Sequence, residues 1–267
     1  MRLAVSALLW LTTALPMLAH ELWLEPEQSI VTPDERVNVR ILIGSDFLGE
    51  ELGNFPSMQE TVDLFVEGER YKIAGRVGDL PAFTFQPEVP GLHILRYQSI
   101  HNVVTYDSYE LYLKFLVEAQ REDLAAVHDG RGLSRDGITE VFTRYAKGLI
   151  AVGDGAGADL VTGMPFELVA QENPYQRDGD AVTFALLLDG KPAQDAALHL
   201  FIRKTDGSID ESIRLRTDAQ GLVEVPTAEP GFYMLNAIQI FPATPEMETL
   251  QAASWQSLWA STTFEIR

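Results

Sequence analysis

The sequence contains no cysteine among its 267 residues. This absence excludes a disulfide framework, thiolate metal sites and cysteine nucleophiles. The fold must therefore be held by its core, and a hydrophobic content of 46% is enough to form one. Any transition-metal site in this chain would have to use nitrogen and oxygen donors.

Basic residues are also scarce. The chain has 20 Lys and Arg against 39 Asp and Glu, which gives a net charge of -19. Such an acidic chain does not bind nucleic acid or an anionic membrane by electrostatics, so we expect no nucleic-acid partner. The acidic surplus would attract cations, and it would equally keep an exported protein soluble.

Long apolar segments are lacking beyond the first residues. Residues 1–19 combine a positive charge at Arg2, an apolar run and a small residue at Ala19, which is the form of a secretory signal peptide. The run is shorter than the roughly 20 residues that a membrane span needs. We therefore expect a periplasmic protein with no membrane span after cleavage at Ala19. Cleavage after Ala14, which leaves Leu15 first, is the alternative.

Cleavage after Ala19 would make His20 the first residue. An α-amino group and an imidazole on one residue can chelate a metal together, and one further imidazole would complete a T-shaped set of three nitrogens. That set suits Cu(II), and next Ni(II). The α-amino group has a pKa of about 8, so a strongly binding metal displaces its proton easily.

Two histidines could supply the further imidazole. His93 and His101 have the same parity along a predicted strand, but eight residues separate them by roughly 26 Å. They are therefore alternatives and not a pair. His101 lies at a strand end, where loops carry sites, and is the preferred partner. We expect His199 to face solvent without a function, and His128 to end a helix as a favourable cation.

The sequence pattern predicts a mainly β fold with two β-sandwich domains joined by a short helical segment. After the signal peptide (1–19), strand signals fill residues 20–117, a helical connector and linker covers 118–159, and strands return in 160–267. Strands are expected at 37–43, 61–67, 70–74, 82–86, 91–99, 181–188, 197–203, 214–217, 222–225, 234–240 and 259–266.

Two helices are expected between residues 110 and 150. The first runs from about residue 111 to His128, and the second follows a cap at Ser134. The apolar face of the second has helical spacing and comprises Ile138, Val141, Phe142, Tyr145 and Leu149. The glycine-rich stretch 153–159 predicts a flexible linker.

Aromatic residues offer a second candidate surface. Tyr97, Tyr106, Tyr109 and Tyr112 could line a groove for a sugar or peptide, although packing between sheet and helix explains their spacing better. Trp23, Trp255 and Trp259 are expected to pack in the core.

Signatures of an enzyme are missing. The sequence has no Ser-His-Asp spacing and no His-Glu-x-x-His motif, so we expect a protein without enzymatic activity. A copper oxygenase built on an N-terminal histidine is the one enzymatic route left, and nothing identifies a substrate surface for it.

Several motifs match known families. The turns DGKP (189–192), TDAQG (217–221) and PGFY (230–233) make the second half resemble a transthyretin-like or carboxypeptidase-regulatory-like sandwich. The whole mature chain resembles an exported bacterial family of unknown function, often labelled as periplasmic components of nickel or cobalt uptake. That resemblance rests on AHELWLEP (19–26), RYAKGL (144–149), PFELV (165–169) with NPY (173–175), and WQSLWAS (255–261).

This resemblance implies an immunoglobulin-like domain followed by a transthyretin-like domain. It also implies a role in handling Ni, Co or Cu ions, with a membrane metal-uptake system as the partner. The leading hypothesis is thus a periplasmic metal-binding accessory protein that uses His20 with His101 or His93. The alternative is a module that binds a protein or glycan and no metal.

Overall fold

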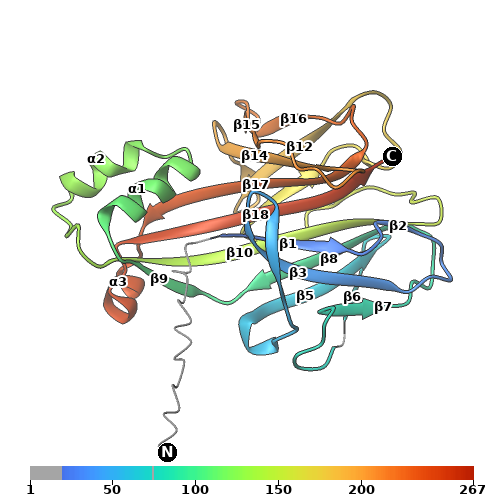
Figure 1. Ribbon diagram of the computed structural model, residues 1–267, viewed down its shortest axis with the longest axis horizontal. Coiled ribbons are helices and arrows are strands. Elements are labelled where there is room, and N and C mark those ends of the chain that lie inside the picture. The colour runs from blue at the N-terminus through green and yellow to red at the C-terminus, as the bar shows by residue number, and fades with distance from the viewer. Residues whose placement is uncertain (1–19, 74) are drawn as a thin grey trace, which may run out of the picture.

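The computed structural model describes residues 20–73 and 75–267 (Figure 1). The predicted signal peptide lies outside the described residues. The architecture is mainly β, as the sequence predicts, with strands gathered into several sheets and short helices at one end. None of the helices in the described part of the chain is long and apolar enough to cross a membrane.

The largest sheet has ten strands. Its main path follows the order β15 (Ile213–Arg216), β14 (Ala197–Lys204), β17 (Gly231–Pro242), β18 (Trp255–Ile266), β10 (Ile138–Val152), β8 (Gly91–Ser99), β5 (Gln59–Val66) and β6 (Glu69–Lys72). Two short strands also pair with β10, namely β2 (Ile30–Val31) and β9 (Asn102–Tyr106). The pair β10–β18 is parallel, whereas β10 and β8 are antiparallel.

Two smaller sheets complete the architecture. One contains β1 (Glu21–Pro26), β3 (Val37–Ser45), β4 (Leu48–Leu52) and β7 (Phe83–Phe85). The other contains β11 (Phe166–Ala170), β12 (Ala181–Leu188), β13 (Lys191–Pro192) and β16 (Leu222–Pro226).

The small sheets cover opposite faces of the large one. Even-numbered residues of β10, such as Ala146 and Ile150, pack in one core with Leu22 of β1. Odd-numbered residues, such as Tyr145 and Leu149, pack in another core with β11 and β12. The large sheet is therefore the middle layer, and β10 is buried along its whole length.

The expected second helix is wrong, because β10 occupies its place. The apolar residues from Ile138 to Leu149 fit a helical stripe, but a strand buried on both faces also lacks an alternating pattern. β-Branched and aromatic residues dominate the segment and favour a strand. Ser134 does not cap a helix; its hydroxyl instead bonds the backbone of Asp136 in a turn.

Helices cover the rest of the sheet face on which the even-numbered side chains of β10 lie. The first predicted helix is divided into α1 (Tyr109–Glu118) and α2 (Asp123–Gly130), and Gln120 between them has a φ of 53°. Ser108 caps α1 by accepting a hydrogen bond from the Leu111 N–H. A third helix, α3 (Pro245–Gln251), and a 3-10 turn (Pro56–Met58) complete the elements.

Aromatic residues fill the space under these helices. Trp255 and Tyr112 are fully buried, and Tyr106 and Trp259 are 2% exposed. All four belong to the cluster formed by α1, α2 and the large sheet. The packing interpretation is therefore confirmed for them, and a ligand groove lined by Tyr106 and Tyr112 is excluded.

The large sheet crosses both predicted domain boundaries. Strands β5, β6, β8 and β9 come from residues 20–117, while β14, β15, β17 and β18 come from residues 160–267. Both groups are joined through β10, which comes from the predicted connector. The linker that follows β10 is also fastened to the core, because the buried Asp159 carboxylate bonds Lys147 at 3.0 Å.

Candidate metal site around His20

His20 immediately precedes β1, whose first residue Glu21 pairs with Gly44 of β3. Its ring Nδ1 is 2.8 Å from the Ser45 hydroxyl oxygen, and its carbonyl accepts a hydrogen bond from Arg144 Nε at 3.0 Å. Partial burial, and then the Arg144 charge, lower the pKa of His20. The neutral ring is the form that binds metals.

Two buried or half-buried carboxylates accompany His20. Glu21 opens β1 and is 4% exposed, while Glu118 ends α1 and is half-buried. Burial, and then repulsion from Glu118, raise the pKa of Glu21 to about 8. Burial, and then repulsion from the exposed Asp46, raise the pKa of Glu118 to about 7.

The β3–β4 turn places Asp46 in this group. Asp46 and Phe47 both adopt left-handed backbone conformations, with φ of 54° and 63°. The Phe47 ring packs edge-on against Trp23 of β1, with 5.4 Å between centroids, and stacks on Phe232 at 5.6 Å. This packing holds the turn against the start of β1.

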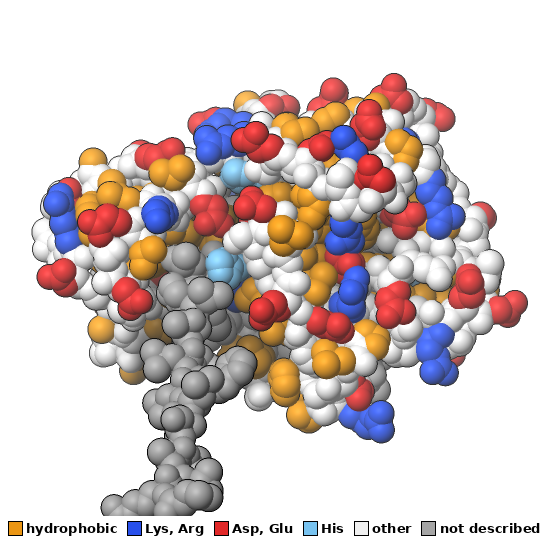
Figure 2. Space-filling model, viewed as in Figure 1, with side chains coloured by type: hydrophobic (Ala, Val, Ile, Leu, Met, Phe, Trp, Pro, Cys, Tyr) orange, Lys and Arg blue, Asp and Glu red, His pale blue; other side chains and the backbone are white. Residues whose placement is uncertain are grey.

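Polar atoms of this group are incompletely paired. Arg144 is the buried cation of the group, and its Nη2 has no hydrogen-bond partner among the described residues. The same holds for Glu21 Oε2 and Glu118 Oε1. Figure 2 shows acidic side chains between two histidines on this face, next to the point where the described chain begins.

The structure does not bring His101 to His20. Asn102 of β9 pairs with Phe142, so His101 lies beside Thr143, whose hydroxyl oxygen is 2.7 Å from the His101 Nδ1. Thr143 belongs to the odd face of β10, whereas β1 and His20 cover the even face. The two imidazoles therefore lie on opposite sides of the large sheet.

His93 shares the even face but lies too far along it. It pairs with Ile150, whereas His20 contacts Arg144. The strand length between residues 144 and 150 is roughly 20 Å. The His93 ring is buried, bonds the Gly91 carbonyl at 3.2 Å and stacks on Phe85.

The two remaining histidines are structural. The expectation that His199 faces solvent is wrong, because it is half-buried with Nε2 2.9 Å from the carbonyl of Glu118. His128 lies in the last turn of α2, as predicted, and its side chain is fully buried. Its ring lies 2.9 Å from the Ser134 carbonyl and accepts a bond from Trp255 Nε1 at 3.1 Å.

Side chains alone do not form a ready metal centre in the described chain. No group of three or more His, Asp or Glu side chains there is arranged to hold a metal ion. The chelate predicted from the sequence also uses the amino group that cleavage would free on His20. This group belongs to the backbone and is not one of these side chains. Sequence reasoning missed Glu118, whose position at the end of an apolar helix stripe gave only a weak signal.

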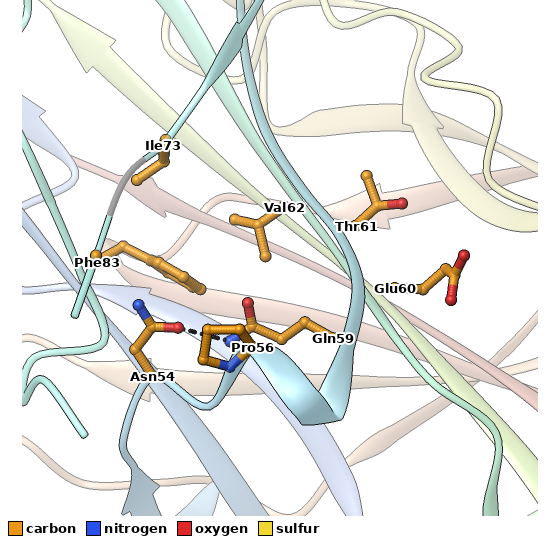
Figure 3. Close-up of a pocket in the computed structure, with 9 residues that line it drawn as sticks. Asn54, Pro56, Gln59, Glu60, Thr61, Val62, Ile73 and Phe83 are labelled. Atoms are coloured by element: carbon orange, nitrogen blue, oxygen red, sulfur yellow. Dashed lines mark hydrogen bonds between the residues drawn. The ribbon is translucent and has the colours of Figure 1, made fainter. Parts of the chain in front are cut away.

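Open cavities lie elsewhere in the molecule. One of about 280 Å³ lies beside β5 and is lined by amide, hydroxyl and hydrocarbon groups. Figure 3 shows Asn54 and Gln59 joined by a 2.9 Å hydrogen bond there, with Glu60 pointing away. A second cavity of about 340 Å³ is lined by His93, Phe85 and Tyr71 among others. Neither contains His20.

The comparison with protein families gives one match. A family described as a domain of unknown function, DUF4198, matches residues 17–240. The chain belongs to this family. The match includes the segment around His20 and most of both predicted sandwich regions, and the family's description names no activity. No curated protein matches the chain.

Among solved structures, the chain is similar to the crystal structure of a tetra-tandem repeat in the extending region of a large adhesion protein. The identity is 10%, the TM-score is 0.23, and the alignment covers 93% of this chain and 50% of that one. The chain thus spans half the length of this structure. A TM-score this low does not indicate a shared fold.

Proposed function

We propose that this protein is an exported, periplasmic accessory protein that binds a transition-metal ion at His20 for a membrane uptake system. One observation carries the proposal. The residue that would begin the mature chain is held by Ser45 and Arg144 and is followed by Glu21, a buried carboxyl group whose Oε2 lacks a partner among the described residues.

The donor chemistry supports Ni, Co or Cu. The amine and Nδ1 of a first-residue histidine close a small chelate ring around an ion. Nδ1 is the nitrogen that the Ser45 hydroxyl now contacts, so it already faces a polar partner. Nitrogen and oxygen donors without thiolates favour Cu(II) or Ni(II) in tetragonal geometry. The sequence resemblance to exported proteins labelled for nickel and cobalt uptake supports a transport role.

Purified exported protein provides the test. N-terminal sequencing should give His20 first, and titration with Cu(II), Ni(II) and Co(II) should show one ion bound. His20→Ala should abolish that binding. His101→Ala is the matched control and should bind like wild type, since it lies on the opposite face.

Two results would overturn the assignment of the ion to His20. One is a first residue other than His20, and the other is undiminished binding by His20→Ala. If the wild-type protein binds none of the three ions, the module that binds protein or glycan becomes the better account.

A further inference from the structure

We propose that Lys147 and Asp159 condense with loss of water, so that an amide bond joins β10 to the segment before β11. Glu167 acts as the base in this reaction. The chain has no cysteine and therefore cannot form a disulfide, and the amide would supply a covalent cross-link in its place. The bond would form with or without a metal ion at His20.

The nucleophile is the amine of Lys147. Lys147 is the one buried lysine in the described part of the chain, and it lies on the face of β10 that packs against β11. Its Nζ is 3.0 and 3.2 Å from the two carboxyl oxygens of Asp159. The Asp159 carbon between these oxygens is therefore within about 3.5 Å of Nζ, the separation from which well-oriented groups react.

The backbone polarises the Asp159 carboxyl group. The N–H groups of Leu160 and Ala170 donate to its two oxygens at 2.8 and 2.9 Å. Such donors stabilise the negative charge that develops on oxygen when a nucleophile adds to the carbon. Burial also raises the pKa of Asp159 and so favours the neutral acid. The neutral acid can lose water after attack, whereas a carboxylate anion resists attack.

Glu167 places a second carboxylate beside the amine. Its Oε2 is 3.6 Å from the Lys147 Nζ, and its side chain is 1% exposed. The N–H and hydroxyl of Thr162 donate to Oε2 at 3.0 and 2.8 Å, and the Gly163 N–H donates to Oε1 at 3.1 Å. These bonds fix the carboxylate beside the ammonium group whose proton it would accept.

The charges of this group favour condensation. Within the described chain, Lys147 is the only cation at ion-pair distance from either Asp159 or Glu167. Two carboxylates beside one ammonium group would leave a buried negative charge without compensation, which is strongly unfavourable. A proton kept on Asp159 makes the group neutral. The result is an acid, a carboxylate and an ammonium group, which are the reactants that condensation needs.

The reaction balances within these three side chains. Glu167 takes a proton from the Lys147 ammonium group, and the free amine attacks the Asp159 Cγ. The Nζ–Cγ bond forms and one C–O bond breaks, and the departing hydroxyl leaves with a second amine proton as water. The product is a neutral amide, and Glu167 keeps the proton that it received. Exclusion of water from the buried site opposes the reverse hydrolysis.

Mass spectrometry of the purified wild-type protein tests the bond. The denatured protein, with its first residue determined, should be lighter than its sequence mass by one water molecule. Trypsin should not cut after Lys147, because its amine would be acylated. Residues 145–177 should therefore appear as one peptide that is lighter by one water, whereas a free Lys147 would give 145–147 and 148–177 separately.

Three variants locate the reacting groups. Lys147→Arg keeps a cation but has no amine that can condense, so it should have its full sequence mass. Glu167→Gln removes the base and should also have its full mass. Lys114→Arg is the matched control at an exposed lysine and should keep the loss of one water. Thermal unfolding checks that each variant is folded, and the wild-type tryptic peptide locates the bond without any variant.

Two results would overturn the proposal. One is a folded wild-type protein with its full sequence mass. The other is a loss of water that Lys147→Arg retains, because the water would then come from another site, such as cyclisation at Asp189 before Gly190. A wild-type loss of water in Glu167→Gln would overturn the role of Glu167 as the base. None of these results bears on metal binding at His20.

Discussion

At the residue scale, the protein tolerates buried acids only in particular surroundings. Glu140 is completely buried between α1 and the large sheet, where the hydroxyls of Tyr106 and Ser257 bond it. Burial outweighs these hydrogen bonds and raises the pKa of Glu140 to about 7. In an unfolded chain a glutamate has a pKa of about 4.3.

This difference predicts how stability depends on pH. Between about pH 4.3 and about pH 7 the folded protein keeps a proton on Glu140 that the unfolded chain has released. The free energy of unfolding should therefore fall as pH rises through this window, by up to about 1.4 kcal/mol per pH unit for this group. Urea unfolding of wild type and Glu140→Gln at several pH values measures the slope.

The variant should have a shallower slope than wild type. Glu122→Gln, which removes an exposed acid, should keep the wild-type slope. Equal slopes for Glu140→Gln and wild type would show that Glu140 does not hold a proton in the fold.

The sequence identified only part of the candidate site at this scale. His20 follows a cleavage pattern, and Glu21 is its neighbour, so both can be found by reading along the chain. The distance between His93 and His101 was also predictable from strand geometry. The position of Glu118 was not, because it depends on how the end of α1 docks on β14, and no local pattern encodes that docking.

At the element scale, β3 and β10 show which strands can be predicted from the sequence and which cannot. Strands with one buried face, such as β3, alternate clearly and were predicted at their positions. β10 is buried on both faces, so its pattern contains no alternation and resembles a helical stripe. Its β-branched and aromatic residues favour a strand, and pairing with β18 and β8, which lie far away in the sequence, stabilises it.

β10 also fastens the segment that follows it. The Lys147 ammonium is fully buried, bonds both carboxylate oxygens of Asp159 at 3.0 and 3.2 Å, and donates to the Leu160 carbonyl at 3.0 Å. Glycines at 153, 155 and 157 predicted a flexible linker, but the buried contact between Lys147 and Asp159 holds the end of this stretch against β10. Long-range pairing of this kind cannot be read from glycine content.

Lys147→Met tests this contact. The substitution leaves two buried carboxylates, Asp159 and Glu167, without their cation. We expect the free energy of unfolding to fall by about 3–5 kcal/mol. Lys114→Met, at an exposed position of α1, should change it by less than about 0.5 kcal/mol. Denaturant unfolding measures both, and equal effects would exclude a structural role for the buried ion pair.

At the scale of the whole molecule, one sheet runs through both predicted sandwich regions. The mainly β class follows from composition and turn signals, and the structure confirms it. The continuity of the sheet was not predictable, because it depends on the parallel pairing of β10 with β18 across a separation of more than a hundred residues. The main core likewise combines Leu92 and Tyr145 with Phe184 and Phe264.

This continuity predicts cooperative unfolding. Separating the two regions would break the β10–β18 pairing and expose the shared core, so the described chain should unfold in a single transition. Calorimetry of the mature protein should give equal calorimetric and van't Hoff enthalpies. Two resolved transitions would show that the regions fold as independent domains.

The central claim is that the first residue of the exported protein chelates a metal ion, and one measurement tests it most directly. Cu(II) affinity is compared for the protein that begins at His20 and for the same protein carrying one additional alanine before His20. The extension converts the amine into an amide and leaves every side chain in place. The account predicts a large loss of affinity in the extended protein. Equal affinity would contradict it.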